Sequence, residues 1–135
     1  MNSTESRRPK SHKQIRKHWA PFFWKKKNFD SEFEFIEEKK TCFACGYDWE
    51  EAGVFLQAAH IIARFDGGSD EVDNLLLLCE YCHKAQEACA QISGDREKTL
   101  EWVVQRTLLD AQLHLAARRG AHLSQLLKPF LKENL

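Results

Sequence analysis

The chain has 135 residues, of which 43% are hydrophobic and 30% are charged, a size and balance that suit one compact globular domain. No apolar run approaches the ~18 residues of a transmembrane helix, and the N-terminus lacks the apolar stretch of a secretory signal, which excludes a membrane-spanning protein and predicts one that is not secreted. The net charge is zero, but residues 1–27 hold nine Lys/Arg and one acid, whereas residues 28–135 hold eleven bases and nineteen acids.

Residues 1–28 are interpreted as a basic, aromatic N-terminal arm. Its positive charge predicts a nucleic-acid-binding segment, and a solvated tail that binds nothing in particular is the alternative. Residues 1–18 are mainly polar and basic, Ile15 being an exception, and are predicted to be disordered in the free protein. The aromatic run 19–24 is predicted to pack on the main domain, with stacking on bases as the alternative. The arm's candidate phosphate-binding side chains are Arg16, Lys17, Lys25, Lys26 and Lys27.

Residues 29–92 predict a small α+β unit in which two short strands precede a helix. Val54–His60 has the branched and aromatic content of a strand, and Leu75–Leu78 is a second, apolar strand. Between them lies a loop, 63–74, marked by Gly-Gly and four acids. The remaining predicted elements are a short helix within 30–40, a turn at 41–46 and a helix over Glu80–Gln91.

Residues 93–135 predict a C-terminal helical extension. The tripeptide at 93–95 is expected to end one helix and cap the next. Apolar residues then recur at spacings of three and four, which predicts one helix over Asp95–Arg119 that Gly120 ends, with Pro129 limiting the last helix. Because apolar side chains lie on two faces, this helix should have two packing partners: the core and, as a further hypothesis, a second protomer in a homodimer.

Two C-x-x-C pairs, Cys42–Cys45 and Cys79–Cys82, are separated by 33 residues. Each tight turn directs two sulfurs at one ion, so two such turns predict a closed tetrahedral thiolate site for structural Zn²⁺. The alternative of two redox dithiols is weaker, because redox C-x-x-C motifs usually occur singly at a helix start. The metal would stabilise a strand–loop–strand that has little core of its own. Because the N-terminus does not resemble a secretory signal, we expect the protein to stay in a reducing compartment, the cytoplasm or the nucleus of a eukaryote, where cysteines serve as thiols or metal ligands.

The stretch AAHIIARFDGGSDEVDNLLLLCEYCHKAQ, residues 58–86, resembles the HNH endonuclease family. That family has a His at the end of a first strand, a loop often bearing Gly-Gly, an Asn shortly before a second strand and a second His on the following helix. The resemblance covers about residues 41–90 and implies a small ββα-metal fold stapled by the four-cysteine zinc site. The residues at the family's places are His60, Gly67, Gly68, Asn74 and His83.

The resemblance implies a metal-dependent endonuclease that hydrolyses phosphodiester bonds in DNA. His60 would be the general base, His83 would bind the divalent ion (Mg²⁺, Mn²⁺, Ni²⁺ or Zn²⁺), and Asn74 would brace the loop and orient His60. These residue types suit the reaction, because it needs an activated water and a cation near the growing negative charge. Arg64 and Lys84, which neighbour the site, are expected to contact the DNA backbone.

One position departs from the family pattern. In many family members the residue before the base is an acid or a His that binds the metal, and here it is Ala59. Another side chain could replace that ligand, the site could bind metal weakly, or catalysis could be lost. The alternative function is therefore a catalytically weak or inactive zinc module that binds nucleic acid. The candidate replacement ligands are Gln57, Asp66, Asp70 and Asp73.

Overall fold

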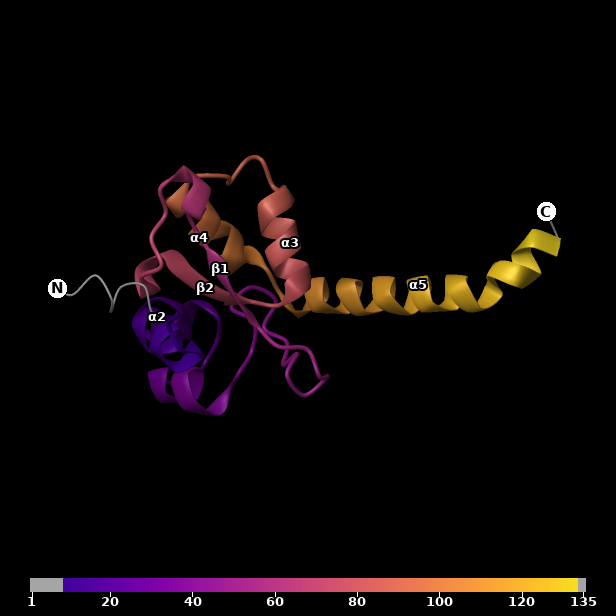
Figure 1. Ribbon diagram of the computed structural model, residues 1–135. Coiled ribbons are helices and arrows are strands. Elements are labelled where there is room, and N and C mark those ends of the chain that lie inside the picture. Colours follow the sequence, from indigo (N-terminus) through magenta and orange to yellow (C-terminus); the bar gives the residue numbers. More distant parts are fainter. Residues whose placement is uncertain (1–8, 134–135) are drawn as a thin grey trace.

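The computed structural model describes the chain from residue 9 to residue 133, with side chains described to residue 120 (Figure 1). The predicted disorder of residues 1–8 falls outside the described residues. The predicted α+β class is confirmed: helices flank one two-stranded antiparallel sheet. In chain order the elements are helix α2 His12–Lys26, π-helical turn η1 Glu34–Glu38, strand β1 Gln57–His60, 3-10 turns η2 Arg64–Asp66 and η3 Val72–Asn74, strand β2 Leu75–Leu78, and helices α3 Glu80–Ala88, α4 Arg96–Gln105 and α5 Leu108–Glu133.

The β1–β2 hairpin is the centre of the fold. Gln57 pairs with Leu78 at one end and His60 with Leu75 at the other. All of β2 is buried, because α2 contacts it while α3 contacts both strands. A four-leucine strand is therefore stable here only with helices on both sides. The sheet places His60 at the last position of β1, where the chain enters the loop before β2.

The prediction that residues 1–18 are disordered is wrong from His12 onward, since α2 begins there. Ser11 and Gln14 form a capping box: each side chain bonds the other's backbone N–H, at 3.1 and 2.8 Å. The buried face of the helix follows at intervals of four residues, at Ile15, Trp19 and Phe23. This periodicity crosses the boundary between the basic and aromatic segments, so it is not evident in either alone. The predicted packing of the aromatic run on the main domain is confirmed for Trp19 and Phe23.

Two basic residues, Arg16 of α2 and Lys27 at its C-cap, are held by backbone carbonyls. Arg16 is 3% exposed and donates to the carbonyls of Phe35, Lys39 and Thr41 at 2.7, 2.6 and 3.0 Å. Burial lowers its pKa to about 10, which leaves the guanidinium charged at neutral pH. The Lys27 ammonium donates to four carbonyls: Ala44, Val103, Val104 and Arg106. In this structure neither side chain is available to a phosphate, which corrects their assignment as DNA contacts.

The long C-terminal helix predicted over 95–119 is wrong as one element. Asp95 caps α4 as expected, accepting from the Lys98 N–H, but α4 ends at Gln105 and α5 begins at Leu108. Between them the Thr107 N–H donates to Asp110 Oδ2 at 2.7 Å, and Thr107 Oγ1 accepts from the N–H of Leu109. Thr107 and Asp110 thus have the T-x-x-D spacing of a helix start, a signal that apolar periodicity does not contain.

Helix α5 continues through Gly120, so the predicted stop there is also wrong. Figure 1 shows α5 projecting away from the rest of the molecule. Its first turns expose Leu108, Leu109 and Leu113. The homodimer through this helix stays a prediction. None of the helices described has the combination of length and apolarity that a membrane crossing requires.

Residues from all three predicted segments share one hydrophobic core. Phe23 of α2, Leu76 of β2 and Val103 of α4 belong to the same buried cluster, as do the cysteines of both pairs. The division into 1–28, 29–92 and 93–135 stays a prediction, and the packing joins the segments into one body.

Candidate functional site

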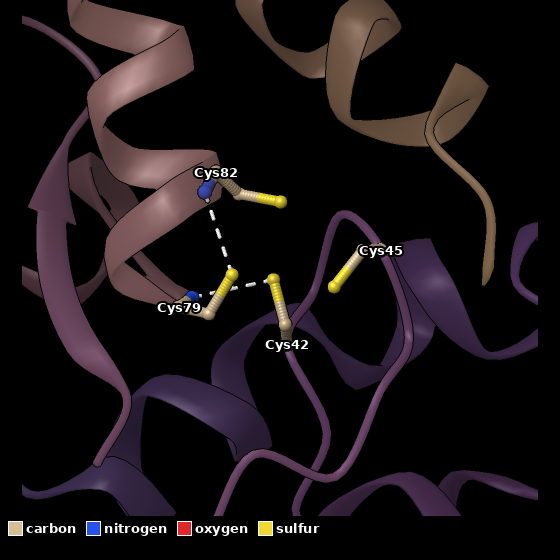
Figure 2. A group of neighbouring side chains, drawn as sticks. All are labelled: Cys42, Cys45, Cys79 and Cys82. Atoms are coloured by element: carbon tan, nitrogen blue, oxygen red, sulfur yellow. Dashed lines mark hydrogen bonds between the residues drawn. The ribbon is translucent and has the colours of Figure 1, made fainter. Parts of the chain in front are cut away.

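The four cysteines converge as their spacing predicts (Figure 2). Cys42 and Cys45 come from the turn before β1, Cys79 is the N-cap of α3, and Cys82 lies in the first turn of that helix. Their Sγ atoms all lie within 4.8 Å of one another, and all four residues are buried. In a tetrahedral zinc site with bonds of ~2.3 Å the sulfurs lie about 3.8 Å apart. The cluster can therefore bind a metal ion with little rearrangement.

Each sulfur also has a nitrogen neighbour. The Cys79 N–H donates to Cys42 Sγ and the Cys82 N–H to Cys79 Sγ, both at 3.4 Å. Trp49 Nε1–H donates to Cys45 Sγ at 3.2 Å. His114 Nε2 lies 3.9 Å from Cys82 Sγ, a contact that the sequence did not indicate. Such donors stabilise negative charge on sulfur, which suits thiolates bound to a cation.

The electrostatics of the cluster favour a bound cation. Burial, the largest effect, raises the pKa of the Cys42 thiol well above its ordinary value. Hydrogen bonding from Cys42 and then from Cys79 lowers the pKa of Cys45. Several thiolates this close and this buried need a positive charge among them. Among the described residues, no other group of three or more His, Cys, Asp or Glu side chains converges in this way.

His60, the predicted general base, is held by a carboxylate. Its Nε2 lies 2.7 Å from Asp70 Oδ1. Arg64 binds both oxygens of the same carboxylate, from Nε at 2.7 Å and from Nη2 at 2.8 Å. The hydrogen bond from Arg64 and then that from His60 lower the pKa of Asp70, so this carboxyl is ionised at neutral pH. A carboxylate on Nε2–H leaves Nδ1 as the nitrogen that accepts a proton.

Asn74 fastens the loop to the end of β1. Its Oδ1 accepts from the Ile62 N–H at 2.9 Å, and its Nδ2 donates to the carbonyls of Ile62 and Ser69 at 2.9 and 2.8 Å. The loop is also tight at Gly68, where an added Cβ would lie 1.7 Å from the Ile62 carbonyl oxygen. No contact joins the Asn74 side chain to His60, so any effect of Asn74 on His60 passes through the loop.

Replacing Asn74 with Ala should therefore destabilise the protein. The change removes three hydrogen bonds and leaves part-buried backbone groups of Ile62 without these partners. At about 1 kcal/mol per bond, we expect a loss of about 3 kcal/mol in the free energy of unfolding. Chemical denaturation followed by circular dichroism measures this. Asp73→Ala, an exposed neighbour, is the control and should change stability by less than about 0.5 kcal/mol; equal stability of the two variants would contradict the role assigned to Asn74.

His83, the predicted metal ligand, has a partner on each ring nitrogen. Nδ1 lies 2.7 Å from Gln57 Oε1 on β1, and Nε2 lies 2.8 Å from Glu87 Oε1 one turn along α3. Gln86 makes a second hydrogen bond between α3 and β1. Its Nε2 donates to the backbone carbonyl of His60 at 3.0 Å. Of the predicted replacement ligands, Gln57 thus contacts His83, and Asp70 contacts His60.

A small cavity of about 150 Å³ lies beside His60 and is also lined by Glu87, the residue that contacts His83. His60, Asp66, Gln86 and Glu87 are among its lining residues. A larger groove of about 860 Å³ lies elsewhere, between the end of α2, the first cysteine turn and the α4–α5 junction, and is bordered by Lys26 and Lys27 rather than by His60 or His83. The smaller cavity is the better candidate for chemistry, because it is lined by the predicted base His60.

The other basic candidates lie on the surface. Lys84 on α3 and Lys17, Lys25 and Lys26 on α2 are exposed. Arg64 is exposed as well, although its guanidinium holds Asp70. Nothing in the fold prevents these side chains from meeting a phosphate backbone.

A family model described as HNH endonuclease matches residues 42–88. The matched range begins at the first cysteine of the cluster and ends with the last residue of α3, and it contains His60, Asn74 and His83. No curated protein matches the chain. No solved structure matches it either.

Proposed function

From the match of residues 42–88 to the HNH endonuclease family model, we propose that the protein is a metal-dependent endonuclease that hydrolyses phosphodiester bonds in DNA. The four cysteines would hold a structural Zn²⁺, and the protein would act in a reducing compartment, the cytoplasm or a nucleus. The observation that carries the proposal is the cavity at the end of β1. It brings together the base candidate His60, held by an ionised carboxylate, and Glu87, which contacts His83.

His60 acts as the general base in this proposal. Its Nδ1 takes the proton of the attacking water, and Asp70 stabilises the resulting imidazolium through Nε2–H. Arg64 keeps Asp70 ionised and fixed, because it binds both carboxylate oxygens. The arrangement is thus ordered outward from the base: His60 reacts, Asp70 orients it, and Arg64 holds Asp70.

His83 would hold the catalytic divalent ion. The Gln57 oxygen accepts from Nδ1–H and leaves Nε2 with the lone pair, which is how metal-binding histidines are commonly oriented. When bound, the ion supplies positive charge that offsets the charge developing on the phosphate and the leaving oxygen. The residues present fit a divalent ion, since an imidazole and a carboxylate meet at this point.

The DNA backbone would be bound by exposed basic residues. Arg64 and Lys84 neighbour the two histidines in sequence and would make the contacts closest to the scissile bond. Lys17, Lys25 and Lys26 would add contacts from α2, and this binding should weaken as salt concentration rises. Arg16 and Lys27 are excluded from this set because their donors bind backbone carbonyls.

A second candidate function is a zinc module that binds nucleic acid without cutting it. Ala59 favours it, because this residue is fully buried and carries no ligand atom at the position that precedes the base. A plasmid nicking assay with Mg²⁺, Mn²⁺ or Ni²⁺ discriminates between the two. Metal-dependent nicking by the zinc-loaded protein supports the endonuclease, whereas salt-sensitive DNA binding without nicking in any of the metals supports the module.

The Asp70 contact yields a separate test of the mechanism. Asp70→Asn keeps the side-chain shape but removes the charge that stabilises the imidazolium of His60, and the nicking rate should fall by about 10- to 100-fold. Because Arg64 and His60 lower the pKa of Asp70, the wild-type carboxylate is ionised from mildly acidic to alkaline pH, so this deficit should be present throughout that range. Asp73→Asn is the matched control. A deficit confined to one end of the pH profile, or none at all, would count against the orienting role.

A further inference from the structure

We infer that Glu87 is a second protein ligand of the catalytic divalent ion and replaces the ligand that Ala59 cannot supply. The inference rests on the proposed function, because it concerns the ion of that site. His83 and Glu87 are four residues apart on α3, so their side chains share one helix face. Their Nε2 and Oε1 atoms lie 2.8 Å apart.

Gln57 fixes the orientation of the His83 ring beside Glu87. Gln57 Oε1 lies 2.7 Å from Nδ1 and has no proton to give, so Nδ1 carries the hydrogen. Nε2 is the ring nitrogen that faces the Glu87 carboxylate, 2.8 Å from Oε1. Two ligand atoms bound to one divalent cation lie at about this spacing. Gln57 would then be the positioning residue that fixes the ring.

The pair is open to substrate and adjacent to the base. The side chains of His83 and Glu87 are 24% and 68% exposed, so an ion held there keeps sites for water and phosphate oxygens. Glu87 also lines the cavity that His60 lines. The ion and the base would then act on the same phosphate, as hydrolysis requires.

The other candidate ligands of the region are less suitable. Asp70 is committed to Arg64 and His60, and Gln57 to the His83 ring. Asp66 lines the same cavity as Glu87 but makes no contact with His83, which makes it the matched control. One imidazole and one carboxylate suit Mn²⁺, Mg²⁺ or Ni²⁺, with water and phosphate completing the coordination.

Mn²⁺ binding to the zinc-loaded protein tests the inference, followed by electron paramagnetic resonance and by calorimetry. Glu87→Gln should weaken Mn²⁺ binding by about 10- to 100-fold with an unchanged melting temperature, whereas Asp66→Asn should stay within about twofold of wild type. His83→Ala should weaken it at least as much as Glu87→Gln. Wild-type affinity in Glu87→Gln, or no Mn²⁺ binding by the wild-type protein, would overturn the inference.

The outcomes also separate this inference from the proposed function. If the wild-type protein nicks DNA with Mn²⁺ and Glu87→Gln binds Mn²⁺ as tightly as wild type, the endonuclease stands and the ligand assignment is wrong. If Mn²⁺ binding depends on Glu87 but no metal supports nicking, the ligand assignment stands and the endonuclease is wrong.

Discussion

Removing the metal from the four-cysteine site is expected to unfold the hairpin and α3. A zinc chelator should abolish the cooperative thermal transition seen by circular dichroism, and added Zn²⁺ should restore it. Structural zinc contributes about 10–16 kcal/mol in small zinc domains, whereas the net stability of a whole domain is about 5–15 kcal/mol. The contribution of the ion is therefore comparable to the whole net stability of a domain, and its loss should leave the folded state unstable.

The geometry explains why so much depends on one ion. Both strands have four residues, which is too short for an independently stable hairpin. The first cysteine turn is joined to β2 by the Phe43 N–H, which donates to the Leu77 carbonyl at 2.8 Å. Cys79 follows β2 directly and begins α3. The cluster thus fixes the turn, the strand and the helix at a single point.

Cys79→Ser tests the same dependence without a chelator. It should abolish stoichiometric zinc binding and the cooperative unfolding transition. Cys89→Ser is the matched control, because Cys89 lies at the end of α3 outside the cluster, and it should keep both. A metal-free protein, verified by elemental analysis, that melts at the wild-type temperature would show that the core alone is sufficient.

The hairpin and the cluster were predictable from the sequence because their signals are local. Two residues between cysteines define a turn, and four consecutive leucines define a buried strand, so β2 and the four sulfurs lie where they were expected. The predicted strand at Val54–His60 is shorter, Gln57–His60, since only those residues find partners on a four-residue β2.

The two wrong helix boundaries lie where a short capping motif coincides with a longer pattern of charge or of apolar periodicity. The start of α2 was hidden by basic residues around Ile15, although the capping box at Ser11 and Gln14 was present in the sequence. The break between α4 and α5 was hidden by apolar periodicity, although Thr107 and Asp110 have the spacing of a helix start. In both cases side-chain bonds to backbone N–H groups determine where the helix begins.

The partners of the two histidines were less accessible to sequence reasoning. Asp70 contacts His60 from ten residues away across an irregular loop, and no periodicity predicts that contact. Gln57 and His83 come from different elements. Glu87 is different, because its spacing of four from His83 on a predicted helix places both side chains on one helix face. The roles of His60, Asn74 and His83 stay predictions, and the alanine variant of each residue tests them.

His60→Ala is expected to lower the rate of metal-dependent DNA nicking by about 10²- to 10⁴-fold, the usual contribution of a general base. The fold should persist. Gln86 donates to the backbone carbonyl of His60, and the pairing of His60 with Leu75 is also made by the backbone, so both contacts survive the loss of the ring. The melting temperature and the zinc content should therefore stay close to those of the wild-type protein.

Rescue by a small molecule distinguishes a base from a structural side chain. Added imidazole should restore part of the nicking rate in His60→Ala, because the deletion leaves room beside the small cavity for an exogenous base, and the rescue should grow with the fraction of unprotonated imidazole. His12→Ala, which removes an exposed histidine on α2, is the control and should nick at the wild-type rate. If His60→Ala nicks as fast as His12→Ala, the ring of His60 is not the base, and the arrangement of Asp70 and Arg64 around it must serve the loop rather than the reaction.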